Sequence, residues 1–327
     1  MLDLANAVVI ANPAAGGGRV GRHWKAICRV LREELGEVPV WRTERPGHAR
    51  ILAKEALWEG KDVLLSLGGD GTHSEVVGGL VRDRPRPGAI TVGVLPAGTG
   101  GDFRRILLGS GDLREHARRL RTDAPHDIDV GVLAYRTPLD EPAERIFLNE
   151  ASIGLGGRVC RYVDHSHKAL GGGPTYFLNT LRALATYEPA WVRLAVDGQV
   201  VGDFELGTVM IANGRYAGAG MQFAPDAVLD DGMLDVIVVG RAALPRMLTL
   251  APALYGDRAH DHPLLSRFRG LSVAVRPLTE GTLTVEADGD ALGAGGVEAT
   301  MIPGAIRMVG VRPDVLRKRG APTPDSA

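Results

Sequence analysis

Three glycine-rich loops contain the residues whose types and spacing could bind phosphate. They cover residues 12–18, 68–72 and 98–102, and each follows a short apolar run that is typical of a buried strand. Glycine allows backbone N–H groups to approach a phosphate, and a helix that follows the loop adds the positive end of its dipole. One such loop is weak evidence because many strand-to-helix turns need a positive φ angle. Three together indicate a nucleotide site, with ATP as a phosphoryl donor as the leading hypothesis.

The first loop also matches a different kind of nucleotide site. Gly16, Gly18 and Gly21 have the spacing of the dinucleotide fingerprint, and Glu44 is a candidate ribose partner. A dinucleotide site therefore stays open, although it does not explain the sequence Gly-Gly-Asp-Gly-Thr at residues 68–72. The chain has no Gly-Lys-Ser or Gly-Lys-Thr of a Walker loop, so any phosphates are held without that lysine.

Three aspartates are candidates for the metal that phosphoryl transfer needs. Asp70 and Asp102 lie within the loops, and Asp129 lies where the sequence pattern changes. A divalent metal bridges phosphate oxygens, and carboxylates hold it directly or through water. On sequence alone, a turn or cap aspartate is an equally good interpretation of Asp129.

Two later acidic turns each have a structural alternative. Asp288-Gly289-Asp290 closes a predicted strand, and an ordinary Asp-Gly hairpin turn would explain it without any chemistry. Asp230-Asp231-Gly232 is either a turn or a set of oxygen ligands for Mg²⁺ or Ca²⁺.

Apolar runs that alternate with helical periodicity predict a parallel α/β sheet over the first third of the chain. Strands are expected at residues 8–11, 63–67 and 90–95, and helices at 24–35 and 47–58. In the second helix, Ile51 and Leu52 are expected to point inward.

After about residue 129, alternating apolar positions closed by turn residues predict an antiparallel β domain over residues 131–304. A last strand near 306–311 is expected to return to the nucleotide-binding domain, which then comprises residues 1–130 and 305–318. Residues 319–327 offer nothing apolar to bury and are expected to be a disordered tail.

Composition narrows the class of protein. The 327 residues are 45% hydrophobic and 24% charged, which fits a globular protein of two domains. A net charge of -1 argues against a nucleic-acid partner. The two cysteines, Cys28 and Cys160, show no Cys-x-x-Cys spacing, which fits a reducing cytoplasm without a disulfide framework or zinc. No run of ~18 apolar residues occurs, so any membrane contact is expected to be peripheral.

In combination these motifs resemble those of the bacterial diacylglycerol kinase and sphingosine kinase-like lipid kinases, distant relatives of NAD kinases and 6-phosphofructokinases. The resemblance covers nearly the whole chain. The matching segments are Asn12-Pro13-x-x-Gly16, Gly68-Gly69-Asp70-Gly71-Thr72 with Glu75-Val76-Val77, Pro96-x-Gly98-Thr99-x-x-Asp102-Phe103, Asn149-x-Ala151-Ser152-x-Gly154, Ala224-Pro225-Asp226, Asp230-Asp231-Gly232-x-Leu234-Asp235-Val236 and Asp288-Gly289.

The resemblance implies an α/β nucleotide-binding domain with an NAD kinase- or phosphofructokinase-like parallel sheet. It also implies a C-terminal antiparallel β-sandwich that takes the lipid, with the active site in the cleft between the domains. The residues that it assigns to ATP are Asn12, Pro13, Ala14, Ala15, Gly16, Thr43, Gly69, Asp70, Gly71, Thr72, His73, Ser74, Glu75 and Thr99.

The same resemblance implies two magnesium sites. Asp70, Asp102 and Asp129 would form the water network of a catalytic Mg²⁺. A second, structural Mg²⁺ would use Asp231 and the carbonyl oxygens of Val228 and Met233.

The general base would fall in Asp288-Gly289-Asp290, where the family pattern is Asp-Gly-Glu. Aspartate is one methylene shorter, so Asp290 reaches less far toward an acceptor hydroxyl, while Asp288 is unchanged. Gly101 and Ser74 also depart from the family, which has asparagine at both positions.

The leading hypothesis is an ATP- and Mg²⁺-dependent kinase for a diacylglycerol-like or sphingoid lipid that enters from a membrane surface. The residues that could line this entry, or belong instead to a helix packed on the sandwich, are Leu170, Tyr176, Phe177, Leu181 and Leu184. A kinase for a soluble acceptor and a nucleotide-binding protein with weakened catalysis are the alternatives. A homodimer is compatible with the sequence.

Overall fold

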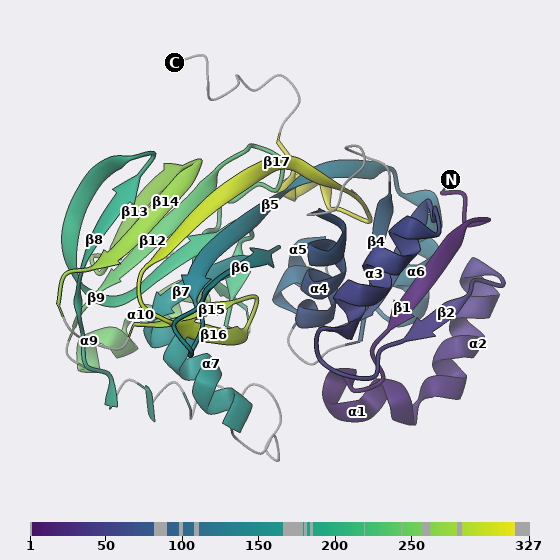
Figure 1. Ribbon diagram of the computed structural model, residues 1–327, viewed down its shortest axis with the longest axis horizontal. Helices are drawn as coiled ribbons and strands as arrows, with labels where there is room; N and C mark the ends of the chain where they lie inside the picture. Colours follow the sequence, from purple (N-terminus) through teal and green to yellow (C-terminus); the bar gives the residue numbers. More distant parts are fainter. Residues whose placement is uncertain are drawn as a thin grey trace. The chain divides into compact units, whose positions relative to one another are not determined.

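The protein is described from a computed structural model (Figure 1) that describes residues 2–81, 90–97, 101–107, 111–165, 179, 182–183, 186–218, 220–242, 244–256, 262–279 and 283–317. Some sequence-based predictions fall outside this range, namely residues 98–100 of the third loop, which include Thr99, the five residues expected to line the lipid entry, and the tail. The chain forms two compact units. The first contains Met1–Val130, Leu229–Asp231 and Pro303–Ala327, and the second contains Gly131–Val228 and Gly232–Ile302.

The first unit is built on a parallel sheet in the strand order β2-β1-β3-β4-β17. The strands are β1 (Ala7–Ala11), β2 (Val40–Arg42), β3 (Val63–Gly68), β4 (Thr91–Pro96) and the end of β17 (Val297–Val309). β1 and β3 are buried along their whole length, as continuous apolar runs in a parallel sheet should be. β17 joins this sheet through Arg307, which pairs with Thr91.

Helices cover both faces of this sheet. Their bounds are α1 (Ala15–Arg22), α2 (Trp24–Leu35), α3 (His48–Trp58), α4 (Asp70–Val81), α5 (Asp102–Leu107) and α6 (Leu113–Thr122), and the short helix η2 (Pro313–Val315) follows β17. Residues of α2 and α6 share a core with Val9 and Leu65 on one face. Side chains alternate along a strand, so Ser66 faces the other side, where it meets His73 of α4.

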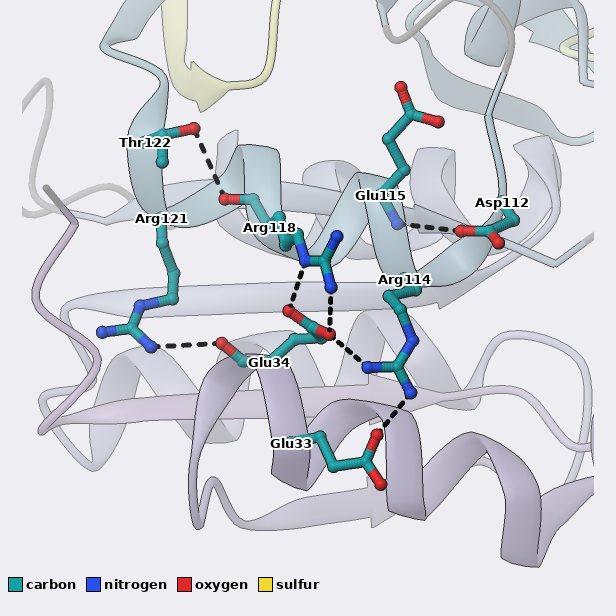
Figure 2. Close-up of polar contacts among 8 residues, drawn as sticks. All are labelled: Glu33, Glu34, Asp112, Arg114, Glu115, Arg118, Arg121 and Thr122. Atoms are coloured by element: carbon teal, nitrogen blue, oxygen red, sulfur yellow. Dashed lines mark hydrogen bonds and ion pairs between the residues drawn. The ribbon is translucent and has the colours of Figure 1, made fainter.

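A network of ion pairs fastens α6 to α2 (Figure 2). The Glu34 carboxylate accepts hydrogen bonds from Arg118 at 2.8 and 3.2 Å and also from Arg114, which bonds Glu33 as well. Arg121 donates to the backbone oxygen of Glu34 at 3.2 Å. These contacts hold the polar edges of two helices whose apolar sides face the sheet.

Helix α3 packs closely on α4, and the residues that it buries differ in part from the prediction. Ala49, Leu52, Ala53 and Ala56 are buried, a spacing that forms one stripe along the helix. The inward prediction is therefore confirmed for Leu52 and wrong for Ile51, which is 46% exposed. Ile51 falls outside the stripe because, at 3.6 residues per turn, it lies nearly on the opposite side of the helix from Ala49 and Ala53.

The second unit is a sandwich of two antiparallel sheets. Its strands are the end of β5 (Pro125–Arg136), β6 (Pro142–Phe147), β7 (Glu150–Gly154), β8 (Trp191–Val196), β9 (Gln199–Ala212), β12 (Leu234–Gly240), β13 (Leu265–Gly270), β14 (Ser272–Pro277), β15 (Thr284–Ala287), β16 (Asp290–Ala294) and the start of β17. One sheet has the order β16-β15-β7-β9-β12-β13, and the other has β6-β5-β17-β14-β8-β9. The long strand β9 takes part in both, and the apolar side chains between the sheets form one core.

Smaller elements complete this unit. They are the hairpin of β10 (Tyr216–Ala217) and β11 (Met221–Gln222) and the helices α7 (Leu155–His165), α9 (Leu244–Leu248) and α10 (Leu250–Leu254). Helix α7 packs on β15 and β7. In the described part of the chain, no helix combines the length and apolar character that a membrane span requires.

Candidate active site

The loop after β1 is held in a conformation that only glycine adopts readily. Gly16, Gly17 and Gly18 have φ angles of 63°, 65° and 79°. A Cβ on Gly16 would lie 2.7 Å from the backbone oxygen of Ala97, whereas one on Gly17 would meet nothing within 4 Å. The loop therefore packs against the end of β4 at one glycine and borders open space at the next.

Asn12 links this loop to the one after β3. Its side-chain nitrogen donates to Thr72 Oγ1 at 3.0 Å, and its side-chain oxygen accepts from the Ala14 N–H at 2.9 Å. Gly68 is needed beside this contact, because a Cβ there would lie 2.5 Å from Thr72 Oγ1. Parallel strands end at the same edge of their sheet, which is why loops distant in sequence meet here.

Asp70 joins the second loop to the third. It is the first residue of α4, and its Oδ2 accepts from the backbone N–H groups of Gly101 at 3.1 Å and Asp102 at 3.0 Å. The positive end of the α4 dipole also favours a carboxylate at this position. Asp70 is thus fixed by two neighbouring backbone groups.

Asp102 and Asp129, the other expected metal carboxylates, belong to the same unit. Asp102 pairs with Arg105 at 2.6 Å, and Asp129 is 2% exposed and accepts from the Gly304 N–H at 2.7 Å. Across the described residues, no three His, Cys, Asp or Glu side chains are grouped closely enough to hold a metal ion directly. Coordination of a catalytic Mg²⁺ through water stays a prediction.

The expected ATP residues within the described chain lie around this edge of the sheet. Asn12, Pro13, Ala14, Ala15 and Gly16 follow β1, Thr43 follows β2, and Gly69, Asp70, Gly71, Thr72, His73, Ser74 and Glu75 connect β3 to α4 and form its first turns. The Thr43 N–H donates to the Ala11 oxygen at 2.9 Å, which keeps it beside the end of β1.

Two of these residues have contacts inside the fold. The Glu75 carboxylate accepts from the backbone N–H groups of Gly47 at 2.8 Å and Ala49 at 3.2 Å, so it caps the start of α3. His73 is buried and bonds Ser66 at 2.8 Å, and burial lowers the pKa of His73 to about 3. Neither their assignment to ATP nor that of the other residues is tested by these contacts.

In the second unit, Asp288 and Gly289 form the turn between β15 and β16. Their φ angles are 48° and 84°, the left-handed pair that an Asp-Gly hairpin turn requires. The Asp288 carboxylate accepts from the backbone N–H groups of Leu148 and Asn149, both at 2.9 Å, and of Glu150 at 3.2 Å. Its oxygens anchor the turn to the segment that joins β6 to β7.

Asp290, the other candidate base, is more accessible. Its side chain is 49% exposed and forms an ion pair with Arg145 of β6 at 2.5 Å. The structural Mg²⁺ assigned to Asp231, Val228 and Met233 stays a prediction, although Asp231 is nearly buried at 9% exposure.

The sequence interpretation missed two buried carboxyl groups beside this turn, Glu286 and Glu150. They are 2% and 6% exposed. Strand alternation places Glu286 opposite Val285 and Ala287, on the face away from the sandwich core, where a charged residue is ordinary. Only the packing of α7 on β15 shows that this second face is covered too.

Two family models match the chain. The diacylglycerol kinase catalytic domain matches residues 6–133, and the YegS C-terminal NAD kinase beta sandwich-like domain matches residues 149–310. A protein of Pseudomonas aeruginosa named as a probable YegS-like lipid kinase is 33% identical over 87% of this chain and 88% of its own length. The chain belongs to this family of lipid kinases.

Further relatives agree with this assignment. The lipid kinase is 29% identical to a diacylglycerol kinase of Bacillus subtilis over 80% of its own length and 83% of the relative. The crystal structure of a diacylglycerol kinase from Bacillus anthracis matches 97% of this chain and 100% of that one, with a TM-score of 0.70 and 24% identity. The expected fold class, a parallel α/β unit followed by an antiparallel β-sandwich, is therefore confirmed.

Proposed function

We propose that this lipid kinase uses ATP and Mg²⁺ to phosphorylate the hydroxyl of a diacylglycerol-like or sphingoid lipid. The observation that carries the proposal is the contact of Asp70, which fixes a carboxylate between two glycine-containing loops at the start of a helix. Such an arrangement offers backbone N–H groups to phosphate and a carboxylate to a metal. Relatives from Bacillus subtilis and Staphylococcus aureus that are named diacylglycerol kinase support this acceptor class.

The glycines at the end of β1 fit a phosphate. Gly17 borders open space and has a left-handed backbone, and because it has no side chain a phosphate could approach the backbone of the loop there. Asn12 holds the loop to Thr72, so the proposed phosphate contacts from both loops keep a fixed spacing.

The donor set also fits Mg²⁺, because carboxylate oxygens are hard ligands of the kind it prefers. When bound, Mg²⁺ would neutralise charge on the transferring phosphoryl group. The contribution of the chain is orientation, since backbone N–H groups direct the carboxylates of Asp70 and Asp129.

Asp290 is the proposed general base. It takes the proton of the acceptor hydroxyl as that oxygen bonds to the γ-phosphorus, and the bond from the γ-phosphorus to the bridging oxygen breaks to release ADP. Asp288 suits this role less well because its carboxylate already accepts three backbone N–H groups. Arg145 directs the Asp290 carboxylate.

A phosphoryl-transfer assay tests the proposal. Labelled γ-phosphate is offered with a total lipid extract in mixed micelles, or with a panel of soluble alcohols, and the product is identified by mass. Asp290→Asn should cut turnover by roughly 10²- to 10⁴-fold if Asp290 is the base. Asp203→Asn is a matched control, because Asp203 is also a partly exposed aspartate that pairs with an arginine, Arg193.

The outcomes separate the alternatives. Label on a soluble alcohol alone would show that the acceptor is not a lipid. Tight ATP binding without transfer to any acceptor would replace the kinase proposal with a nucleotide-binding protein. An unchanged rate in Asp290→Asn would remove Asp290 from its role.

A further inference from the structure

Two buried glutamates, Glu150 and Glu286, contact the turn that precedes Asp290. Glu286 belongs to β15 and Glu150 begins β7, and these strands are antiparallel neighbours in which Glu286 lies opposite Ser152. Glu286 accepts from Ser152 Oγ at 2.5 Å and from the Gly289 N–H at 3.1 Å. Glu150 lies two residues before Ser152 on the same face of β7, and a hydrogen bond from its side chain lowers the pKa of Glu286.

A hydrogen bond between two carboxyl groups requires a proton on one of them, because an ionised carboxylate has nothing to donate. Each oxygen of Glu286 already accepts a hydrogen bond, one from Ser152 and one from Gly289. An arrangement in which Glu286 accepts and Glu150 carries the shared proton satisfies all three of these contacts.

The pair holds the turn from two sides. The side chain of Glu286 accepts from the Gly289 N–H, while the backbone of Glu150 bonds Asp288 in both directions, at 2.9 Å and 3.2 Å. Asp290 follows these residues and pairs with Ala287 at the start of β16. The direction of Asp290 thus depends on contacts made by Glu150 and Glu286.

We propose that Glu150 and Glu286 share one proton and act as positioning residues for the turn that carries Asp290. The ionised Glu286 is the stronger acceptor for the Gly289 N–H, so the turn is held best when Glu150 alone carries the proton. A second proton, on Glu286, weakens that contact. This inference rests on the proposed function of Asp290.

Several charged groups surround the pair. Burial raises the pKa of Glu286 to about 7, and the charge of Asp288 acts in the same direction, while the hydrogen bonds from Glu150, Ser152 and Gly289 oppose it. Asp290 of β16 is balanced by Arg145 of β6. Helix α7 packs on β15 and brings Gly157 against the backbone of Thr284.

The pH profile of kcat tests the inference in the full chain. In the wild type, kcat should rise about fivefold between roughly pH 6 and pH 8 as Glu286 ionises. Glu286→Gln keeps an oxygen for Gly289 but cannot ionise, so the step should vanish and kcat at pH 8 should fall about fivefold, with KM for ATP unchanged. Glu150→Gln should keep the step, because its amide donates to Glu286 as the protonated acid does.

Glu298→Gln is the control for loss of a glutamate in the same unit, since Glu298 of β17 is exposed and pairs with Arg276 of β14. It should keep the wild-type profile. A step of wild-type size in Glu286→Gln, or loss of the step in Glu150→Gln, would overturn the inference.

Thermal unfolding gives a second readout that needs no lipid transfer. The raised pKa of Glu286 should lower the wild-type Tm as pH rises from about 4.5 to about 7. Subtracting the Glu286→Gln profile should isolate this fall. If no lipid is phosphorylated, the proposed function fails while this difference still tests the pair, and equal profiles would refute it.

Discussion

Two substitutions of Asp70, by asparagine and by alanine, separate its contribution to stability from its contribution to catalysis. A single oxygen, Oδ2, accepts from the N–H groups of Gly101 and Asp102 at 3.1 and 3.0 Å. Asparagine can place its one carbonyl oxygen at that position and accept both, whereas alanine accepts neither. Hydrogen bonds to a charged group contribute roughly 1.5 to 3 kcal/mol each, so Asp70→Ala should lower the free energy of unfolding by about 3 kcal/mol or more. Asp70→Asn should lower it by about 1 kcal/mol.

Turnover should depend on the charge of Asp70, which asparagine removes even though it keeps the hydrogen bonds. If the charge of Asp70 acts on the metal and phosphates, Asp70→Asn should cut kcat by roughly 10²-fold or more while the protein stays folded. Urea denaturation gives the stabilities, and γ-phosphate transfer gives the rates. Equal destabilisation by Asn and Ala would refute the shared-oxygen geometry, and full activity of Asp70→Asn would refute the need for charge.

Three further changes test other parts of the first unit. Gly16→Ala should weaken ATP binding in an equilibrium titration and lower the free energy of unfolding by about 1 to 2 kcal/mol. The reason is that Gly16 has a left-handed φ of 63° and that a Cβ there would approach Ala97. Gly17→Ala should cost less stability, because a Cβ at Gly17 would meet open space. Glu75→Gln should destabilise α3 by about 1 kcal/mol in urea denaturation, and an unchanged stability would contradict its capping contact. His73 should lower stability as pH falls from 6.5 toward about 3, because the unfolded chain takes up the proton first; Tm profiles of wild type and His73→Gln should diverge in that range, and parallel profiles would exclude this effect.

The elements that position the loops were predictable from the sequence because each depends on local pattern. Continuous apolar runs fixed the identity of β1 and β3, and glycines at their ends marked the loops. The Asp288-Gly289 sequence likewise predicted the hairpin turn, since the turn needs two residues that tolerate a positive φ.

What the sequence could not show depends on which surfaces are covered. Ile51 is apolar, but it lies across the helix from the stripe of Ala49, Ala53 and Ala56, and its side of the helix stays exposed. Glu286 looks like a solvated residue on an alternating strand, yet α7 covers its face. Periodicity assigns a side chain to a face, but a second element decides whether that face is buried.

The turn at residues 288–290 shows why structural and chemical interpretations of one motif need not compete. Asp288 has a positive φ and gives its carboxylate to three backbone N–H groups, so it makes the turn. Asp290, one residue beyond Gly289, is half exposed and paired with Arg145, so its carboxylate stays accessible. A structural aspartate and an accessible one are thus separated by a single glycine. Because the accessible residue is short, its reach depends on where the turn sits, and the turn is held by Glu286. If Asp290 is the base, precise support of the turn therefore matters more for its reach than it would for the longer side chain of glutamate.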